Sequence, residues 1–447
     1  MGYLISGGTV VNTTGQQRAD VLLEGDRISA VAPNLSAHGH TTIDAQGCLI
    51  FPGFIDPHTH FDMECGSFST ADDFISGSRA AILGGTTTVL DFAEPYGAET
   101  TNSAYRNWRQ KAAKSSCNYA FHMTLPRWEN DTARQMETTV ANGITSFKVY
   151  TTYDMMLDDA SLLRVFEAAA RLNAVVCVHC EDDDMIHTAM QALKEQNKTG
   201  FAYFALSRPA ESEAAAVARV LHLAERAGAR VYLVHLSTAA ALEQVRLARA
   251  RGQELYAETC TQYLVLTQDY YQSAEPETFV MCPPLRTQAD CDALWAALAD
   301  GTIQTVGTDH CSFTRAQKLA SGAKIGAVPG GCAGVAQRAQ LLYTYGVSKG
   351  RITPEQFVSL LSSEPARIYG IPERGRIEPG MIADLVIWDP ETRTTLTHDN
   401  HQHSCDRSPY AGMQLAGGAR TVFLGGEIVA DNGSLIQAGK GQYLARK

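Results

Sequence analysis

Two histidines spaced two residues apart, His58 and His60, have the residue type and spacing of a metal site. They follow residues 48–51 (CLIF), whose apolar character predicts a β-strand. In an extended chain, side chains two residues apart point to the same side, so both imidazoles would be presented together. Neutral ring nitrogens are good ligands for a divalent transition metal. An isolated pair of this kind more often belongs to a polar loop, so the interpretation depends on further ligands.

Four further polar residues are placed in a similar way, each at the end of a strand-like segment or within one. They are His179, His235 and Asp309, which end residues 175–179, 231–235 and 305–309, and Lys148 within residues 146–150. In a parallel barrel all strands end at one face, so the six groups would converge at its C-terminal mouth. Each alone has a simpler explanation, such as a hydrogen-bonded core histidine, a lysine that reaches solvent or a helix cap. Together they favour a metal centre, because burying them without partners would be costly.

Lys148 needs separate treatment, since a protonated lysine cannot bind a cation. Burial beside metal ions favours loss of its proton. We expect the free amine to form a carbamate with CO2, which makes Lys148 a carboxylate that bridges two metal ions.

The elements that must position these groups alternate along the middle of the chain. Strand-like and helix-like segments follow one another from about residue 53 to about residue 370: strands at 86–91, 144–150, 174–179, 230–236 and 303–309, helices at 71–83, 158–172, 208–219 and 238–251. Such repetition predicts a parallel sheet, and a (β/α)8 barrel is the most common form at this length. A doubly wound open sheet is the alternative, but no glycine-rich phosphate loop opens the region.

Both ends of the chain are rich in short strand-like segments and Gly/Pro turns. Short strands are predicted within residues 376–388 and 420–429, and also within the first 50 residues. We therefore predict an α/β protein of three parts: residues 1–52 as the first part of a small β-sandwich, residues 53–370 as the barrel, and residues 371–447 as the second part of the sandwich with a C-terminal tail.

Composition narrows the class of protein. The chain has 447 residues, of which 45% are apolar and 19% charged, with a formal net charge of −11. This balance is ordinary for a globular enzyme and argues against nucleic acid or an anionic membrane as partner. The N-terminus lacks the basic and apolar regions of a signal peptide, and no run of about 18 apolar residues predicts a membrane span. The 11 cysteines form no CxxC pair. We expect reduced thiols and a cytoplasmic protein.

Six motifs carry a resemblance to a known family: GFIDPHTHFD (53–62), TADDF (70–74), GGTTT (84–88), SFKVY (146–150), PPLR (283–286) and GTDHC (307–311). With these motifs the chain resembles the cyclic amidohydrolases, and within them dihydropyrimidinase and D-hydantoinase. The resemblance implies a barrel with a β-sandwich-like domain and two metal ions, usually zinc. His58, His60, Lys148 and Asp309 would hold one ion, and Lys148, His179 and His235 the other. The implied reaction is hydrolytic ring opening of dihydropyrimidines or 5-substituted hydantoins to N-carbamoyl amino acids.

The resemblance also assigns catalytic roles. A water activated by two metal ions attacks an amide carbonyl near neutral pH. Asp309 would take its proton and later deliver it to the leaving nitrogen. Tyr153 stands where the family has a phenol that donates to the oxyanion, although a packed loop aromatic would look the same in sequence.

Substrate-binding positions depart from the family pattern. Main-chain groups of Cys282 and Gly330 would hold the cyclic imide, where the family has other side chains, and Ala336 replaces a usual glutamate. Backbone contacts can survive such changes, but these departures leave undetermined which cyclic substrate the enzyme prefers. Another set of positions either shapes the pocket for the exocyclic substituent or merely packs a loop: Cys65, Tyr150 and Leu157.

Three other polar groups are interpreted without a direct catalytic role. Residues 398–403 (HDNHQH) look like a metal motif but are expected to form a polar surface loop away from the barrel strand ends. His310 is a candidate for orienting the site from behind its ligands. Residues 181–184 (EDDD) are expected to be a solvated loop at a helix start.

Two alternatives to the leading function stay open. One is allantoinase or dihydroorotase chemistry in the same fold, which usually has Asn before Pro-Pro and an arginine clamp; Cys282 is nearer the serine of hydantoinases. The other is a non-catalytic scaffold, which retention of all six ligands disfavours. The small cyclic substrate is expected to be the main partner, in a homo-oligomer that is a tetramer or a dimer. Zinc is the expected metal, but manganese and cobalt suit the same ligands.

Overall fold

The computed structural model describes residues 2–66, 68–320, 322 and 324–447. Its centre is a sheet of eight parallel strands in the order β17-β16-β15-β14-β13-β12-β11-β8. The strands are β8 (Phe54–Thr59), β11 (Thr86–Ala93), β12 (Asn118–Thr124), β13 (Ser146–Tyr150), β14 (Val175–His179), β15 (Arg230–Leu233), β16 (Leu255–Cys260) and β17 (Thr305–Gly307). The first and last strands meet, since β8 contacts β17 and Thr59 forms a parallel bridge with His310. The predicted (β/α)8 barrel is confirmed.

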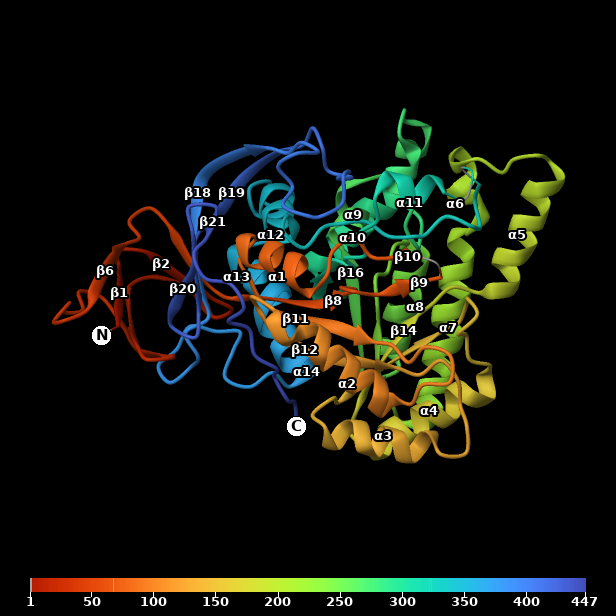
Figure 1. Ribbon diagram of the computed structural model, residues 1–447, viewed down its shortest axis with the longest axis horizontal. Helices are drawn as coiled ribbons and strands as arrows, with labels where there is room; N and C mark the ends of the chain where they lie inside the picture. Colours follow the sequence, from red (N-terminus) through yellow and green to blue (C-terminus); the bar gives the residue numbers. More distant parts are fainter. Residues whose placement is uncertain (1, 67, 321, 323) are drawn as a thin grey trace.

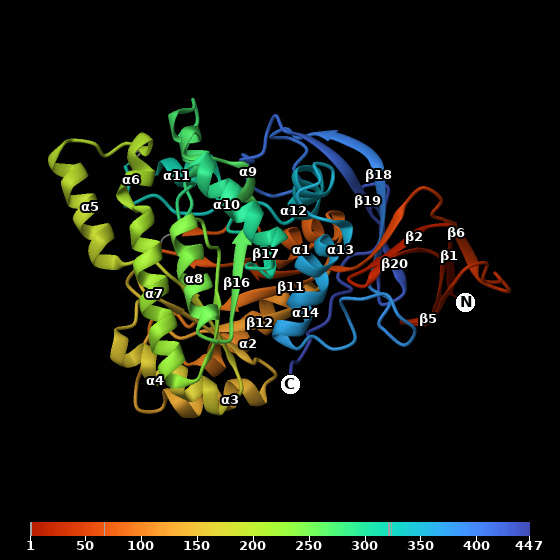
Figure 2. The same cartoon turned by 180° about the vertical axis from the view of Figure 1, so that it is seen from behind.

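Helices surround this sheet (Figures 1 and 2). They are α1 (Phe74–Leu83), α2 (Thr101–Lys111), α3 (Thr132–Ala141), α4 (Asp159–Arg171), α5 (Asp183–Glu195), α6 (Phe204–Ser207), α7 (Ala210–Ala227), α8 (Ala239–Ala250), α9 (Thr261–Val265), α10 (Gln288–Ala299), α11 (Arg315–Leu319), α12 (Arg338–Leu342), α13 (Pro354–Val358) and α14 (Glu364–Tyr369). Local sequence fixes several of their ends. The side chains of Asp158 and Thr238 accept hydrogen bonds from backbone N–H groups at the starts of α4 and α8, and Gly228 ends α7 with φ 65°.

Strands β12 and β16 were not predicted from the sequence. Every residue of both strands is buried, as expected where one face lines the barrel interior and helices cover the other. Both carry an ionisable residue among apolar ones, His122 in β12 and Glu258 in β16, so neither shows a simple alternation. Five of the other six strands match the predicted segments to within a few residues. The strand predicted at residues 48–51 is β7 (Leu49–Pro52), which belongs to another sheet, and the barrel strand β8 follows it.

The two ends of the chain form one sheet-rich unit, as predicted. One sheet has the order β21-β20-β19-β18-β7-β2-β3 and the other β5-β4-β1-β6. Their strands are β1 (Tyr3–Ser6), β2 (Thr9–Asn12), β3 (Gly15–Arg18), β4 (Asp20–Glu24), β5 (Arg27–Ala32), β6 (Thr41–Asp44), β7 (Leu49–Pro52), β18 (Leu385–Thr395), β19 (Gln414–Leu424), β20 (Glu427–Asp431) and β21 (Ser434–Leu435). Antiparallel pairing of β7 with β18 joins the two ends. A shared core lies between the sheets, with Ile5, Ile50, Leu385 and Phe423 fully buried.

We propose residues 1–52, 53–370 and 371–447 as the extents of the sandwich, the barrel and the returning sandwich segment. The last segment differs from the prediction in detail, because residues 376–384 are not a strand and β18 begins only at Leu385. It also contacts the barrel, since the backbone N–H of Leu444 donates to the carbonyl of Tyr119 in β12.

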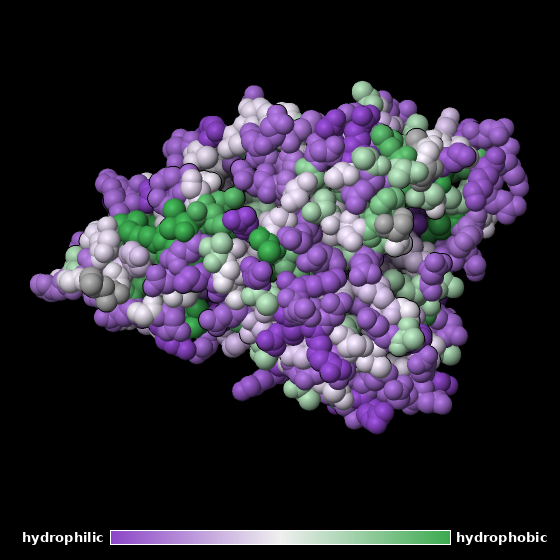
Figure 3. Space-filling model, in the orientation of Figure 1, coloured by the Kyte–Doolittle hydropathy of each residue, from purple (hydrophilic) through white to green (hydrophobic). Residues whose placement is uncertain are grey.

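The sheet-rich unit lies at one end of the molecule, at the left of Figure 1. Segments that follow barrel strands, including α6, α11 and the short strands β9 (Glu64–Cys65) and β10 (Phe68–Ser69), gather in the upper right half of that view. Purple, hydrophilic residues cover much of the face in Figure 3, and a green, apolar area lies over the sheet-rich end. None of the helices in the described residues has the length and apolar character needed to cross a membrane.

Candidate active site

Three of the predicted ligands form a compact triangle at the mouth of the barrel. Asp309 Oδ1 lies 3.0 Å from His58 Nε2 and 3.2 Å from His60 Nε2, and the two ring nitrogens are 3.3 Å apart. All three residues are buried, and together they are the one group with the geometry of a metal site in the described part of the chain. Ligand atoms about 2.0–2.1 Å from a tetrahedral zinc ion would be roughly 3.4 Å from one another. The triangle therefore matches three of the ligand positions around such an ion.

The other two predicted histidines form a second pair beside this triangle. His179 ends β14 and His235 lies two residues after the end of β15, and His179 Nδ1 is 2.9 Å from His235 Nε2. The rings of His58 and His235 have centroids 5.5 Å apart, which joins the pair to the triangle. The structure thus brings together four imidazoles that come from the ends of three different strands, β8, β14 and β15.

Lys148 lies in the middle of β13, with 1% of its surface exposed. Its Nζ is 4.9 Å from the centre of the Phe92 ring and 5.0 Å from that of Tyr150. Among the described residues, no carboxylate lies within 4.0 Å of Nζ to form an ion pair. Burial therefore lowers the pKa of Lys148, which favours the uncharged amine that carbamate formation requires.

Two carboxylates, those of Glu258 and Asp309, face His58 in the pocket and favour positive charge there. Burial alone would lower the pKa of His58, but the neighbouring Glu258 and Asp309 raise it to about 9. Burial also opposes ionisation of Asp309, yet the imidazole of His58 holds the pKa of that carboxyl well below its usual value. The Nδ1 atoms of His60 and His235 are buried and have no hydrogen-bond partner among the residues that the structure describes. A set of imidazoles and a carboxylate with these properties fits divalent metal ions.

Two buried glutamates orient the histidines from behind. Glu258 Oε1 is 2.7 Å from Nδ1 of His58, and Glu181 Oε2 is 2.8 Å from Nε2 of His179. A carboxylate on the far nitrogen of an imidazole fixes the tautomer and ring orientation that a metal ligand needs. Sequence reasoning missed both glutamates; the signal that could have found Glu258 is a lone carboxylate inside the apolar segment of β16.

The prediction that residues 181–184 form a solvated loop is wrong for Glu181. Its side chain is fully buried and accepts three hydrogen bonds from the guanidinium of Arg208, the shortest at 2.6 Å. The helix-start part of the prediction holds, because the side chain of Asp182 accepts a hydrogen bond from Met185 N at the start of α5. Burial would raise the pKa of the Glu181 carboxyl, but Arg208 and His179 hold it well below its usual value.

Replacing Glu258 by glutamine is expected to weaken metal affinity about 10- to 100-fold, because the oriented charge behind His58 is lost. Zinc content after dialysis against graded concentrations of a chelator measures this loss. Glu213→Gln is the matched control: Glu213 is another buried glutamate, but it accepts hydrogen bonds from Ser237 and contacts no site histidine. Equal zinc retention in the Glu258→Gln variant and the native protein would refute the assigned role.

Tyr153 lies at the edge of the histidine cluster and is open to the outside. Its ring centroid is 5.1 Å from that of His179, the guanidinium of Arg208 lies 5.0 Å from the ring centre, and 38% of the residue is exposed. Tyr153, His235 and Asp309 all have positive φ, at 71°, 40° and 51°. Non-glycine residues rarely adopt this backbone conformation, and when they do they cluster at functional sites.

The predicted substrate-binding positions meet at the same opening. A Cβ atom placed on Gly330 would lie 3.0 Å from Cys282 Sγ, and the backbone N–H of Gly331 donates to the carbonyl of Val280 at 3.0 Å. The side chain of Lys318 binds both segments through the carbonyls of Val280 and Gly331, at 2.6 and 2.7 Å. The two segments therefore lie side by side, as a shared binding role requires.

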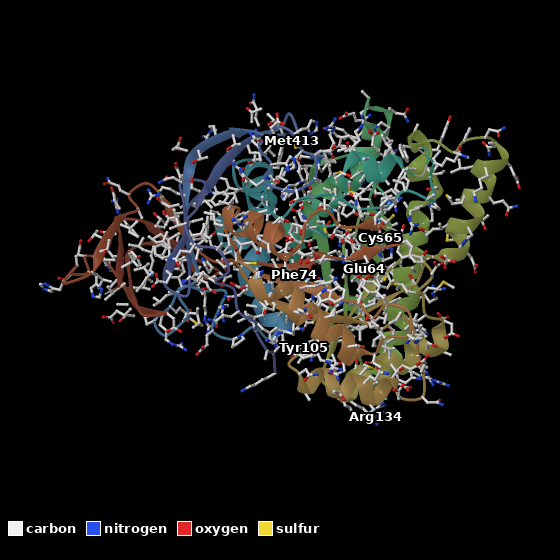
Figure 4. The ribbon with its side chains drawn as sticks, in the orientation of Figure 1. Glu64, Cys65, Phe74, Tyr105, Arg134 and Met413 are labelled. Atoms are coloured by element: carbon white, nitrogen blue, oxygen red, sulfur yellow. The ribbon has the colours of Figure 1, made fainter. Side chains whose placement is uncertain are left out.

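The residues predicted around the exocyclic pocket follow the strand ends. Leu157 N–H donates to the carbonyl of Tyr150, which keeps both buried next to β13. Cys65 is half-buried on β9, which follows β8 at the mouth, and Figure 4 labels it beside Glu64. At the position where the family usually has a glutamate, the backbone N–H of Ala336 donates to Nε2 of His403 at 3.3 Å.

The prediction that residues 398–403 form a surface loop away from the site is wrong for His401 and His403, although Asp399, Asn400 and Gln402 are exposed. His401 is 2% exposed, and the ring centroid of His403 lies 5.0 Å from that of His310, the residue after Asp309. His310 is in turn 3.1 Å from Asp72 through its Nε2. The segment thus packs behind the site instead of lying away from it, and supports the expected orienting role of His310.

Comparison with known proteins identifies the family. The model of the amidohydrolase family matches residues 49–429. The chain belongs to this family. It is 39% identical to a D-hydantoinase of Geobacillus stearothermophilus, covering 100% of this chain and 97% of the relative, and 39% identical to a D-phenylhydantoinase of Escherichia coli (strain SE11), covering 100% and 98%. A crystal structure of dihydropyrimidinase from Brevibacillus agri NCHU1002 matches with a TM-score of 0.97 at 36% identity, covering 100% of this chain and 99% of that one. This amidohydrolase is therefore an enzyme of the predicted class, a hydrolase of cyclic amides.

Proposed function

We propose that this amidohydrolase opens cyclic ureides by metal-dependent hydrolysis, converting dihydropyrimidines or 5-substituted hydantoins to N-carbamoyl amino acids. The observation that carries the proposal is the gathering of His58, His60 and Asp309 against the His179–His235 pair at one strand-end face. Relatives named for hydantoins and a structural neighbour named dihydropyrimidinase support the substrate class.

In this proposal His58, His60 and Asp309 would hold one divalent ion, and His179 and His235 would hold a second. Lys148 would supply a carboxylate to both ions as a carbamate, which forms when its neutral amine attacks CO2 and loses a proton to solvent. Zinc suits the imidazole and carboxylate donors best, although manganese and cobalt use the same set. When bound, such ions activate water and polarise the amide carbonyl.

The protein side chains then handle the proton and the developing charge. Asp309 accepts the proton of the attacking water and delivers it to the leaving nitrogen, since its carboxylate lies among the ligands. Tyr153 donates its phenol O–H to the oxyanion from the open edge of the cluster. Main-chain groups of Cys282 and Gly330 hold the substrate ring. Contacts made by the backbone do not depend on the residue type, so they are compatible with the unusual residues at these two positions.

The test is a direct assay of zinc- or manganese-loaded protein against hydantoin, 5-phenylhydantoin, dihydrouracil, allantoin and dihydroorotate. We expect turnover of the first three to N-carbamoyl amino acids, with about two metal ions per chain and no turnover after chelation. Turnover of allantoin or dihydroorotate alone would show that the enzyme is an allantoinase or a dihydroorotase instead. Absence of bound metal and of all turnover would favour a scaffold.

We also propose that the enzyme acts in the cytoplasm as a homo-oligomer, a tetramer or a dimer. The free state of all 11 cysteines supports a reducing compartment. Light scattering of the purified protein measures the oligomeric state.

A further inference from the structure

One buried carboxylate at the barrel mouth has no part in the proposed mechanism. Glu94 directly follows β11 and is 4% exposed. Its carboxylate accepts one hydrogen bond, from the phenol of Tyr150 to Oε1 at 3.4 Å, and no cation lies within 4.0 Å among the described residues. Buried carboxylates normally have more partners than this, because an unpaired one is costly.

Strand alternation shows where Glu94 points. The ring of Phe92 faces the barrel interior, since its centroid is 4.8 Å from that of His60 and 4.9 Å from Lys148 Nζ. Glu94 is two residues further along the extended chain, so it points to the same side, one step nearer the mouth. Tyr150 has the same relation to Lys148 on β13.

Glu94 and Tyr150 therefore meet in the interior, each one step nearer the mouth than Phe92 and Lys148, and Tyr150 is paired with His179 in the register of β13 and β14. Between their strands, Thr124 ends β12 in register with Lys148, and its buried Oγ1 has no hydrogen-bond partner among the described residues. This part of the interior thus offers a carboxylate and a hydroxyl that the protein itself leaves largely unpaired.

The nearby cations cannot satisfy this carboxylate in the proposed active enzyme. Lys148 lies one step deeper, but as a carbamate it carries a negative charge instead of a positive one. The ammonium of Lys111 is engaged elsewhere: it donates to the carbonyl of Asp62 at 2.7 Å and lies 4.5 Å from the ring centre of Trp108. Burial already raises the pKa of Glu94 to about 7 in spite of the charge of Lys148.

We infer that Glu94 selects substrates whose ring substituent carries a cation, an ammonium or guanidinium group on a short chain. A substrate held with its amide at the metal site has its substituent in the mouth, the part that Glu94 and Tyr150 line. A cationic substituent supplies the missing partner, whereas an alkyl or aromatic one leaves the carboxylate buried and unpaired. The inference rests on the proposed ring-opening function and narrows its substrate class.

The test compares two hydantoins of equal length, 5-(3-aminopropyl)hydantoin and 5-butylhydantoin, with unsubstituted hydantoin as reference. At about pH 8 the alkylammonium of the aminopropyl compound is charged, and a positive charge close to Glu94 favours the ionised carboxylate. We expect the native enzyme to have a kcat/KM about tenfold or more higher for the aminopropyl compound. In Glu94→Gln, which keeps the shape and removes the charge, that ratio should fall to about one.

Glu64→Gln is the matched control, because Glu64 is an exposed glutamate on β9 at the same mouth. Glu64→Gln removes the same charge and should leave the ratio of the two kcat/KM values unchanged. This result would show that the preference comes from a direct contact with Glu94 and not from the overall negative potential of the opening. Metal content and thermal unfolding of each variant are measured alongside.

If Glu94→Gln fails to fold, the preference of the native enzyme between the aminopropyl and butyl compounds still tests the inference. A preference for the butyl compound, or a ratio that persists in Glu94→Gln, overturns the assignment of Glu94 while turnover of unsubstituted hydantoin leaves the proposed function intact. Failure of the metal-loaded enzyme to open any of the three rings rejects the proposed function and the inference with it.

Discussion

Replacing Lys148 by alanine is expected to remove the bound metal pair and lower kcat by about three orders of magnitude or more. The lysine is the proposed bridge between the two histidine sets, and loss of metal activation is worth several kcal/mol in the transition state. Burial lowers the pKa of Lys148, which favours the neutral amine that the proposed carbamate requires. Metal analysis by mass spectrometry and the rate of hydantoin opening measure the two effects.

Two controls separate the carbamate from the mere presence of a buried lysine. Lys318→Met removes another buried ammonium, which binds backbone carbonyls away from the histidines, and should retain the metal. Short carboxylic acids added to Lys148→Ala should restore part of the activity by replacing the missing carboxylate. Full metal occupancy in Lys148→Ala, or in native protein reconstituted without bicarbonate, would exclude the carbamate.

The sequence predicted the barrel and the approach of its polar groups because both depend on a simple rule. Parallel strands end at one face, so residues such as His179 and Asp309, at or just beyond the ends of apolar segments, must meet there. The same rule did not reveal β12 and β16. Their residues are buried on both faces, and His122 or Glu258 interrupts the apolar pattern that would have marked a strand.

The supporting partners were not predictable because they come from distant parts of the chain. Glu181 looks solvated in a run of four acidic residues, and only the fold places Arg208 against it. His401 and His403 lie in the connection between β18 and β19, which folds back over the barrel. A charge run or a polar loop in sequence gives no information on what covers it.

The role of Glu94 could not be predicted from the sequence either, although its location could. Its position just after β11 marks it as a mouth residue by the strand-end rule, but a single glutamate before a proline has no distinctive spacing. Its meaning depends on Phe92 and Tyr150, which show that the side chain points inward and has little else to bind.

Replacing Tyr153 by phenylalanine is expected to lower kcat about 100- to 1000-fold while the metal content stays unchanged. The phenol is the proposed donor to the oxyanion, and loss of one such donor typically has an effect of this size. The ring would keep its contacts with His179 and Arg208, so the cluster should not rearrange. Steady-state kinetics with hydantoin, together with metal analysis, provide the measurement.

Asp309→Asn serves as the comparison, because Asp309 contacts both His58 and His60 and is also the proposed proton carrier. It should lower kcat and metal content together, whereas Tyr153→Phe should lower kcat alone. The contrast matters because a general loosening of the mouth would raise KM in both variants. A Tyr153→Phe enzyme with native kcat would show that the oxyanion is stabilised by other groups, and one that loses metal would make Tyr153 a support for His179 instead.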